Sequence, residues 1–363
     1  MFKFSELKTL HIELTSRCQA SCPMCARNYH SGQENKNLPL DEISTDDFKC
    51  IVNAEVLAQI EYIYFCGNYG DPIISNNLLE IVSYCKSQKE NIKLGIHTNG
   101  SARTPEWWSR LASSLPIEHS VHFALDGLAD THHLYRVGTS FDKILENAKA
   151  FISAGGRAEW VFLSFKHNEH QVETARQMAK DLGFEKFTHK ATSRFLEKPW
   201  LDVMNAQGEV LYKIEPPSEH KITFIHPDII KSYKKVVETA SINCKAINTK
   251  SLYIDAFKNL WPCCWIGMIP YTYSKPTDIV HEYQTEQSTV INELVTSIGG
   301  YDSINLLKYS VKAILENPDW STVWEKYWNT HSLATCAKIC GTFPEKIITQ
   351  YDEQFIKVES FNE

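Results

Sequence analysis

Short apolar stretches alternate with longer amphipathic ones through the first half of the chain. Strand-like runs cover 10–14, 60–65, 92–97, 119–125, 158–165 and 186–189. Helical periodicity covers 40–58, 77–86, 105–114, 141–154 and 169–182, and glycines follow the last two of these stretches as stop signals. Strands that alternate with helices predict an α/β fold with a parallel sheet and right-handed crossovers.

The pattern changes after about residue 195. Prolines at 199, 216, 217 and 227 interrupt any helical periodicity, so we expect a linker there. A strand-like run at 251–256 and a helical stretch at 290–327 follow. We therefore predict three parts, which are an α/β domain over 1–195, a linker over 196–240, and a small cysteine-rich domain with inserted helices over 241–363.

Three cysteines directly follow the first strand-like run. Cys18, Cys22 and Cys25 have the spacing Cys-x3-Cys-x2-Cys. Thiolates this close can hold three corners of a cubic iron–sulfur cluster, which leaves the fourth iron open for chemistry. A structural zinc site is the alternative, with His11 or His30 as the fourth ligand. A disulfide framework is disfavoured, because the chain is long and shows no secretory leader.

This motif resembles the signature of the radical S-adenosylmethionine (radical SAM) superfamily. The resemblance implies a partial (β/α)6 TIM-like barrel, with a 4Fe–4S cluster held by the three cysteines and SAM bound at the open iron. An external electron donor such as flavodoxin or ferredoxin would reduce the cluster. Cleavage of SAM would then give a 5′-deoxyadenosyl radical that takes a hydrogen atom from the substrate. Met24 stands where the family usually has an aromatic residue against the adenine, and its thioether can also contact aromatic rings.

Polar turns after the next strands resemble further motifs of the same family. The loop from Cys66 to Pro72 is similar to the Gly-Gly-Glu-Pro loop that receives the SAM amino group, although an ordinary tight turn is the alternative. A Thr-Asn-Gly turn follows the third strand. A stretch similar to Ser-x-Asp-Gly…His…Arg follows the fourth, with Ala124 in place of the serine expected at the SAM ribose. The resemblance implies these cofactor-binding residues: Met24, Gly70, Asp71, Pro72, Thr98, Asp126, Arg136, Ser164 and Asn168.

A second group of cysteines spans 244–340 and resembles the twitch or SPASM extension of radical SAM enzymes. The resemblance implies a second, auxiliary 4Fe–4S cluster bound by Cys244, Cys263, Cys336 and Cys340. Two features depart from the family pattern. Three residues separate the last two cysteines where two are usual, and 71 residues separate Cys264 from Cys336. A zinc ribbon with the same four thiolates is the alternative.

The remaining cysteines have no assigned metal. Cys264 could be an alternative ligand, a buried hydrophobic residue, or a thiol that donates a hydrogen atom to a substrate radical. Cys66 is the second candidate for such a catalytic role. Cys50, Cys66 and Cys85 lie in apolar settings, and we expect them to pack as small hydrophobic side chains.

Composition excludes several other classes of protein. The chain of 363 residues is 43% hydrophobic and 22% charged, which is ordinary for a globular protein. No apolar run approaches the ~20 residues needed to cross a bilayer, so we expect no membrane span and a cytoplasmic location. The formal net charge of −7 disfavours nucleic acid as a partner, because phosphate backbones bind basic surfaces.

We therefore expect a radical SAM oxidoreductase in which the auxiliary cluster accepts an electron from the substrate radical. A redox-neutral radical epimerase with a cysteine hydrogen donor is the alternative within the family. A non-enzymatic zinc or iron–sulfur protein is the contrasting class. No peptide-recognition domain is evident, which favours a small molecule over a peptide as substrate. Candidate substrate contacts at the strand ends are His97, His133, Lys166, His189 and Arg194.

Overall fold

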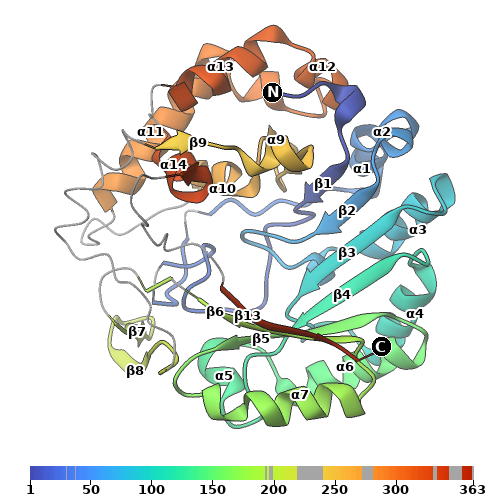
Figure 1. Ribbon diagram of the computed structural model, residues 1–363, viewed down its shortest axis with the longest axis vertical. Coiled ribbons are helices and arrows are strands. Elements are labelled where there is room, and N and C mark those ends of the chain that lie inside the picture. The colour runs from blue at the N-terminus through green and yellow to red at the C-terminus, as the bar shows by residue number, and fades with distance from the viewer. Residues whose placement is uncertain are drawn as a thin grey trace.

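The computed structural model describes residues 1–29, 31–36, 38–192, 194–195, 199–218, 240–271, 281–329, 333–342 and 354–361. Six parallel strands lie in chain order at the centre of a curved sheet (Figure 1). They are β1 Thr9–Ile12, β2 Tyr62–Phe65, β3 Lys93–Thr98, β4 His119–Ala124, β5 Ala158–Ser164 and β6 Lys186–Ala191. This confirms the predicted parallel α/β sheet and partial barrel.

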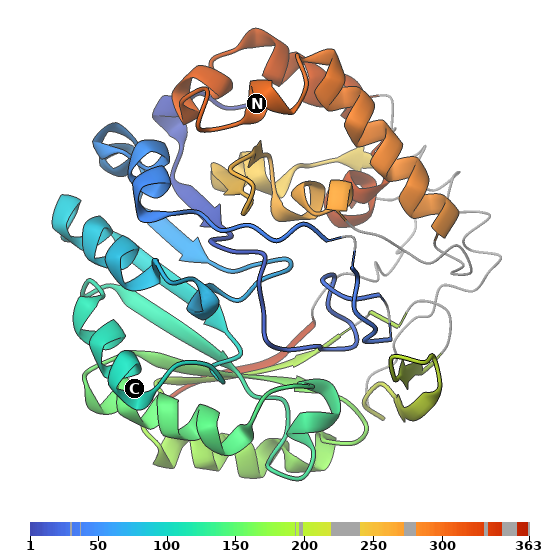
Figure 2. The ribbon, with the colours of Figure 1, turned by 180° about the vertical axis from the view of Figure 1, so that it is seen from behind.

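Helices cover the convex side of this sheet (Figures 1 and 2). They are α1 Thr45–Ile51, α2 Ala54–Gln59, α3 Leu78–Gln88, α4 Pro105–Ser114, α6 Phe141–Ser153 and α7 Val172–Asp181. The short helix α5, His132–Tyr135, follows β4. Trp108 of α4 packs its ring against Phe123 of β4 and Phe151 of α6, and all three side chains are fully buried. Because side chains alternate between the faces of a strand, the polar residues next to these core positions face the concave side.

One predicted helix is wrong in its extent. The single helix expected over 40–58 is two helices, α1 and α2, which meet at Val52 and Asn53. The Asn53 side chain accepts a hydrogen bond from the Val56 amide at 3.1 Å and so caps the second helix. Asparagine favours this position because its side chain satisfies an amide that has no partner within the helix.

The second half of the chain extends the same sheet at one edge. Strand β10 Ser251–Ile254 pairs in parallel with β1, and β11 Leu260–Trp261 pairs antiparallel with β10. At the other edge, β13 Gln354–Ser360 pairs antiparallel with β6. The strand expected at 251–256 is confirmed, and the sheet is continuous across both halves. The domain boundaries near 195 and 240 stay a prediction.

Helices of the second half arc over the β10 end of the sheet (Figures 1 and 2). They are α9 Lys245–Thr249, α10 Cys264–Gly267, α11 His281–Ser297, α12 Val311–Leu315, α13 Pro318–Asn329 and α14 Ala334–Cys340, and the two-residue strands β9 Ser241–Ile242 and β12 Gly341–Thr342 pair beside them. The stretch expected to be helical at 290–327 is helical with breaks. Gly299 and Gly300, with φ of 106° and 80°, end α11 in a conformation that side chains rarely adopt.

The predicted linker contains an unexpected hairpin. Strands β7 Leu201–Met204 and β8 Val210–Ile214 pair antiparallel, while 219–239 lie outside the described residues. The hairpin buries Leu201, Val203 and Ile214 in a small apolar cluster separate from the main core.

Two further expectations can be compared with the structure. Cys85 is fully buried, as expected of a small hydrophobic side chain, whereas Cys50 is exposed near the end of α1, so that expectation was wrong. No helix within the described ranges combines the length and apolar character that a bilayer span requires.

Candidate functional site

The first three cysteines lie on the loop that leaves the C-terminal end of β1. Cys22 is buried, while Cys18 and Cys25 are partly exposed. The Cys25 amide donates to the Cys22 carbonyl at 3.0 Å, which folds the two cysteines into one turn. On the other side of the loop, the Asn99 side-chain amide approaches the Cys18 Sγ to 3.7 Å. The loop thus presents three thiols toward the mouth of the barrel.

A buried arginine stands beside these thiols. Arg136 Nη1 lies 4.0 Å from the Cys22 Sγ, and its Nε pairs with Asp126 Oδ2 at 2.5 Å. Burial raises the pKa of Cys18, and it raises that of Cys22 to about 11 although the Arg136 charge opposes this. Metal binding needs the thiolate form, so a fixed cation at this place favours the ligating state.

The three thiols fit a cluster better than a single ion. Within the described ranges, no group of three His, Cys, Asp or Glu side chains could hold one metal ion. A cubane binds each cysteine through a different iron, so its thiols need not converge on one point. The negative charges of Cys22 and Cys25 both act on Cys18, which places the three in one neighbourhood. The alternative zinc site with His30 as its fourth ligand cannot be compared, because His30 lies outside the described residues.

The predicted loop after β2 is fastened to the cysteine loop and to β3. The Asp71 amide donates to the Arg17 carbonyl at 3.0 Å, and a side chain at Gly70 would collide with the Thr15 carbonyl. The buried Asp71 carboxylate accepts hydrogen bonds from the Thr98 hydroxyl at 2.7 Å and from the Asn99 amide at 2.7 Å. Pro72 begins a 3-10 turn directly after it. Asp71 therefore holds together three loops that meet at the cysteines.

The other predicted cofactor-binding residues have different surroundings. Asp126 accepts from the Leu163 amide at 2.7 Å as well as from Arg136, and it is fully buried. Asn168 is also fully buried, and both ends of its side chain bond the backbone at the end of β5. Ser164 bonds the His189 ring on the helix-facing side of β5. These contacts brace the loops; whether SAM reaches these side chains stays a prediction.

Met24 packs away from the polar part of the site. Its side chain is buried in the small apolar cluster with Tyr135, Phe165 and the hairpin residues. Arg194 donates to the Met24 carbonyl at 3.4 Å. The contact expected between Met24 and an adenine ring stays a prediction.

A buried glutamate next to the cysteine loop was not predicted. Glu13 Oε1 accepts hydrogen bonds from the amides of Tyr69 and Gly70 at 2.8 and 2.9 Å, and its Oε2 accepts one from the Tyr253 hydroxyl. Burial raises the pKa of Glu13. The signal in the sequence is a single acidic residue inside an apolar stretch, which points to a buried partner.

His97 was predicted as a substrate contact, but the row that it forms with His122 and Glu159 on the concave face was not predicted. The His97 and His122 rings stack with centroids 4.1 Å apart, and His122 Nδ1 lies 3.2 Å from Glu159 Oε2. Burial would raise the pKa of Glu159, but hydrogen bonds and charges, led by those of His122, lower it to about 2. Burial lowers the pKa of His97 well below its ordinary value. The alternation of these residues with core positions was visible in the sequence.

The remaining candidate substrate contacts do not gather in one place. His133 is exposed on α5, and Lys166 pairs with Glu215 at 3.0 Å at the surface. His189 faces the helix side of the sheet, where its ring also meets Phe162 edge-on. Of the candidates at the strand ends, His97 is the one placed in the polar row on the concave face.

The four cysteines predicted to bind an auxiliary cluster come together around one small pocket. Its lining is Ile242, Cys244, Pro262, Cys263, Trp265, Ile266, Trp324, Trp328, Thr335, Cys336, Ile339 and Cys340. The Cys340 Sγ accepts from the Lys245 amide at 3.4 Å, and the Cys336 Sγ accepts from the Trp328 indole at 3.3 Å. Four thiols in an otherwise apolar pocket with backbone and indole donors suit an iron–sulfur cluster.

The pKa shifts of the four thiols differ in direction. Burial raises the pKa of Cys263 to about 11 and raises that of Cys336 as well. A hydrogen bond from Cys244 lowers the pKa of Cys340 to about 6. The hydrogen bond between the two thiols therefore favours the thiolate form of Cys340 over that of Cys244.

The neighbouring Cys264 does not line this pocket. Burial raises the pKa of Tyr64, and charges on Cys264 and Cys66 raise it further. A charge on Cys66 also raises the pKa of Cys264. Asn68 links this region to the first cysteine loop, because its side-chain amide donates to the Cys264 carbonyl at 3.0 Å. The two cysteines predicted as hydrogen donors thus interact electrostatically.

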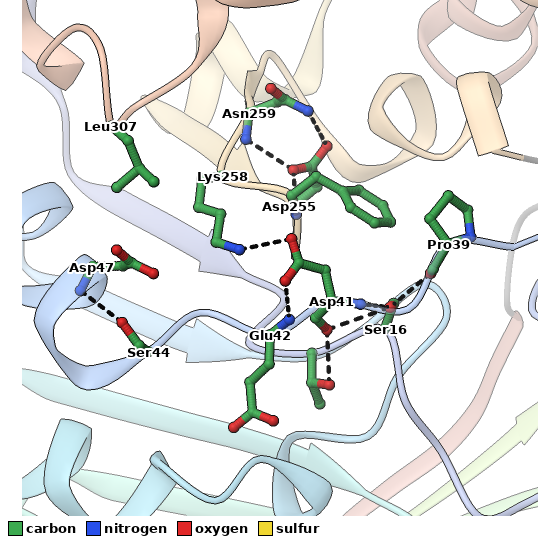
Figure 3. A network of polar contacts seen from close by, with 12 residues as sticks. Ser16, Pro39, Asp41, Glu42, Ser44, Asp47, Asp255, Lys258, Asn259 and Leu307 are labelled. Atoms are coloured by element: carbon green, nitrogen blue, oxygen red, sulfur yellow. Dashed lines mark hydrogen bonds and ion pairs between the residues drawn. The ribbon is translucent and has the colours of Figure 1, made fainter.

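A network of polar contacts near the β10–β11 turn joins the start of the first cysteine loop to the second half of the chain (Figure 3). Lys258 Nζ pairs with Asp41 Oδ2 at 2.7 Å, and the Asp41 carbonyl and amide bond the Ser16 hydroxyl two residues before Cys18. Asp255 accepts from the Trp261 indole at 2.7 Å and from the Asn259 amide at 2.8 Å. The network holds the start of the cysteine loop against the second half of the chain.

Comparison with known proteins agrees with this geometry. Residues 12–182, which include the three cysteines and the strand-end loops, match the family model described as Radical SAM superfamily. The fold and site define an α/β protein with three cysteines on the loop that follows its first strand. Over residues 12–182 the chain therefore resembles a radical SAM domain, a class of domain that uses SAM and a 4Fe–4S cluster.

Two curated relatives match part of the chain. The tungsten-containing aldehyde ferredoxin oxidoreductase cofactor-modifying protein of Pyrococcus furiosus is 31% identical over 133 residues, which cover 36% of this chain and 34% of that protein. The PqqA peptide cyclase of Bradyrhizobium diazoefficiens is 26% identical over 177 residues, which cover 47% of this chain and 43% of that protein. The chain thus spans between a third and a half of the length of these relatives.

A solved structure extends the likeness of fold to the second half. SuiB of Streptococcus suis superimposes with a TM-score of 0.53 at 12% identity, covering 92% of this chain and 73% of that chain. SuiB bound to its precursor peptide SuiA gives the same TM-score and covers 72% of that chain. At this identity, the likeness concerns the fold alone.

Proposed function

We propose that this protein is a radical SAM oxidoreductase with two 4Fe–4S clusters. Cys18, Cys22 and Cys25 would hold the cluster that binds SAM, and the four cysteines of the second pocket would hold an auxiliary cluster that accepts an electron from the substrate radical. When bound, the first cluster and SAM supply a 5′-deoxyadenosyl radical that takes a hydrogen atom from the substrate. The observation that carries the proposal is the gathering of four thiols around one apolar pocket.

The side chains around the first cysteine loop would hold and orient these groups. The Arg136 cation favours the Cys22 thiolate, and Asp126 fixes the position of Arg136. Asp71 keeps Asn99 against the Cys18 thiol, so the loop is shaped before any cofactor arrives. A preorganised loop spares the ordering cost that binding would otherwise incur. Flavodoxin or ferredoxin is the class of electron donor that we propose.

The substrate in this proposal is a peptide or a small molecule. The sequence favoured a small molecule, but two of the similar proteins support a peptide. One is the PqqA peptide cyclase, and the other is SuiB bound to its precursor peptide SuiA. The polar row of His97, His122 and Glu159 gives the concave face hydrogen-bonding groups that either substrate could use.

A redox-neutral radical epimerase is the second candidate. The observation that favours it is the electrostatic influence of Cys66 on Cys264 and of both thiols on the Tyr64 hydroxyl. Either thiol could return a hydrogen atom to a substrate radical. Solvent deuterium in the product that disappears in a Cys264→Ala variant would support the epimerase. A non-enzymatic zinc or iron–sulfur protein would cleave no SAM.

Anaerobic reconstitution tests the proposal. We expect about eight irons per chain, from two cubanes, and formation of 5′-deoxyadenosine when SAM and a strong reductant are added. A Cys263→Ser variant should bind about half of that iron, because one cubane is lost. Cys264→Ser is the matched control and should bind the full amount. Equal iron in all three proteins, or a fully loaded protein that forms no 5′-deoxyadenosine, would contradict the proposal.

A further inference from the structure

One residue touches the surroundings of both cysteine groups. Asn68 lies on the loop after β2, between the first cysteine loop and the turn that carries Cys263 and Cys264. Its main-chain oxygen is 3.9 Å from the Cys25 Sγ. Its side-chain amide donates to the Cys264 carbonyl at 3.0 Å and to the Tyr253 hydroxyl at 3.1 Å. No other contact described above joins a thiol of the first loop to the backbone of the second group.

We propose that Asn68 is the bridge for electron transfer between the two clusters. This inference rests on the proposed function, since it requires the auxiliary cluster. From the Cys25 sulfur, the route crosses one contact to the Asn68 oxygen and follows covalent bonds to its side-chain nitrogen. It then crosses one hydrogen bond to Cys264 and continues along the backbone to Cys263. Electrons tunnel more readily through bonds than across gaps, so a route with two short gaps is favoured.

The surroundings keep this bridge in place. The side chain of Glu13 accepts hydrogen bonds from the loop amides, including that of Asn68. The fully buried Tyr253 side chain stands beside the Asn68 amide. On the far side, the buried Tyr69 hydroxyl bonds the Met268 carbonyl, which docks the same loop on the same turn. Asn68 is thus held by groups that do not themselves lie on the route.

The step itself is a one-electron exchange. One cluster loses an electron and the other gains it, and no bond breaks and no proton moves. Asn68 is therefore a positioning residue for electron transfer, which contacts neither SAM nor the substrate in this assignment. Its removal should slow the exchange between the clusters while both clusters stay loaded.

The test uses the reconstituted full chain without any substrate other than SAM. Both clusters are reduced with dithionite, the excess is removed, and SAM is added. We expect the wild-type protein to release two equivalents of methionine per chain, because each reductive cleavage of SAM consumes one electron and the auxiliary cluster passes its electron to the first cluster. In the Asn68→Ala and Asn68→Asp variants, we expect the first equivalent to form at the wild-type rate. The second equivalent should not form in the time that the wild-type protein needs to form both. The electron paramagnetic resonance signal of the reduced auxiliary cluster should persist.

Tyr69→Phe is the matched control, because it removes a hydrogen bond of the same loop but leaves the route intact. It should still give two equivalents. If both Asn68 variants give two equivalents at the wild-type rate with both clusters loaded, the bridge is overturned. If Tyr69→Phe loses the second equivalent as well, docking of the loop and not Asn68 controls the exchange, which also overturns it. A wild-type iron count that shows one cluster would instead overturn the proposed function.

Discussion

At the scale of single residues, three buried carboxylates shape the loops around the first cysteines. Glu13 accepts hydrogen bonds from amides of the loop after β2, Asp71 joins that loop to the end of β3, and Asp126 pairs with Arg136. A buried carboxylate is costly unless donors surround it, and each of these has several. The cysteine loop therefore rests on a frame whose polar groups are already satisfied by the protein.

Asp255 gives the stability of the fold a dependence on pH. Burial raises its pKa to about 7, although indole and amide donors oppose this. An acid whose pKa is raised in the folded state stabilises the fold most at low pH. Unfolding free energy should therefore fall as pH rises from about 4 to about 7, by at most about 1.4 kcal/mol per pH unit. Denaturation at several pH values would measure this slope.

Asp255→Asn is the comparison for this slope. The variant cannot ionise at that position, so its unfolding free energy should fall less over the same range, even if it is less stable throughout. Other titrating groups are common to both proteins and cancel in the difference. Parallel curves for the two proteins would show that Asp255 does not titrate in this range.

The sequence showed some of these residues and not others. Asp71, Asp126 and Arg136 were singled out because they follow strands in motifs that resemble a known family. Glu13 was missed because the Tyr253 hydroxyl, from which it accepts a hydrogen bond, lies 240 positions away in the chain. The row from His97 to Glu159 was missed for a related reason, since it forms only when neighbouring strands align in register. Local pattern can indicate that such a residue is buried or alternates with core positions, but it does not identify a partner that is distant in the chain.

At the scale of elements, periodicity predicted the six parallel strands and most of the helices that cover them. Their apolar faces repeat in the sequence, so local pattern and tertiary burial agree. The β7–β8 hairpin was missed because prolines and polar residues around it indicated a linker. The pairing of β10 with β1 and of β13 with β6 was not predicted either, because the identity of an edge partner is a property of the folded sheet.

Strand β13 protects the β6 edge of the sheet. The two strands pair antiparallel from Gln354 to Ser360, and Arg176 of α7 pairs with Glu359 at 3.0 Å. Truncation after residue 353 would leave β6 as an open edge, and open edges pair with other chains. We expect the truncated protein to unfold at a lower temperature and to form aggregates that light scattering detects. Val358→Ala is the control, since it keeps the pairing and changes a half-exposed side chain.

At the scale of the whole molecule, the two cysteine groups belong to one continuous sheet. Strand β10 lies beside β1, and the hydrogen bond from Asn68 to the Cys264 carbonyl joins the loop after β2 to the turn after β11. Contacts between the halves then decide how rigidly the two sites are held. These contacts are the Asn68 bridge, the Tyr69 hydroxyl on Met268, and the network around Lys258. A protein that moves electrons between two sites needs this fixed separation.

The Lys258–Asp41 pair gives a direct test of this coupling (Figure 3). Lys258 is 11% exposed and Asp41 is 43% exposed, so the pair is partly shielded from water. Lys258→Met should lower the unfolding free energy by about 1 kcal/mol, since it removes the charge and keeps most of the side-chain packing. Lys308→Met, which breaks the exposed pair with Asp302, is the matched control and should change little. In a double-mutant cycle, Lys258→Met and Asp41→Asn should lower the unfolding free energy non-additively, whereas the same cycle on Lys308 and Asp302 should be additive. Additive effects at Lys258 and Asp41 would mean that the pair does not join the two halves.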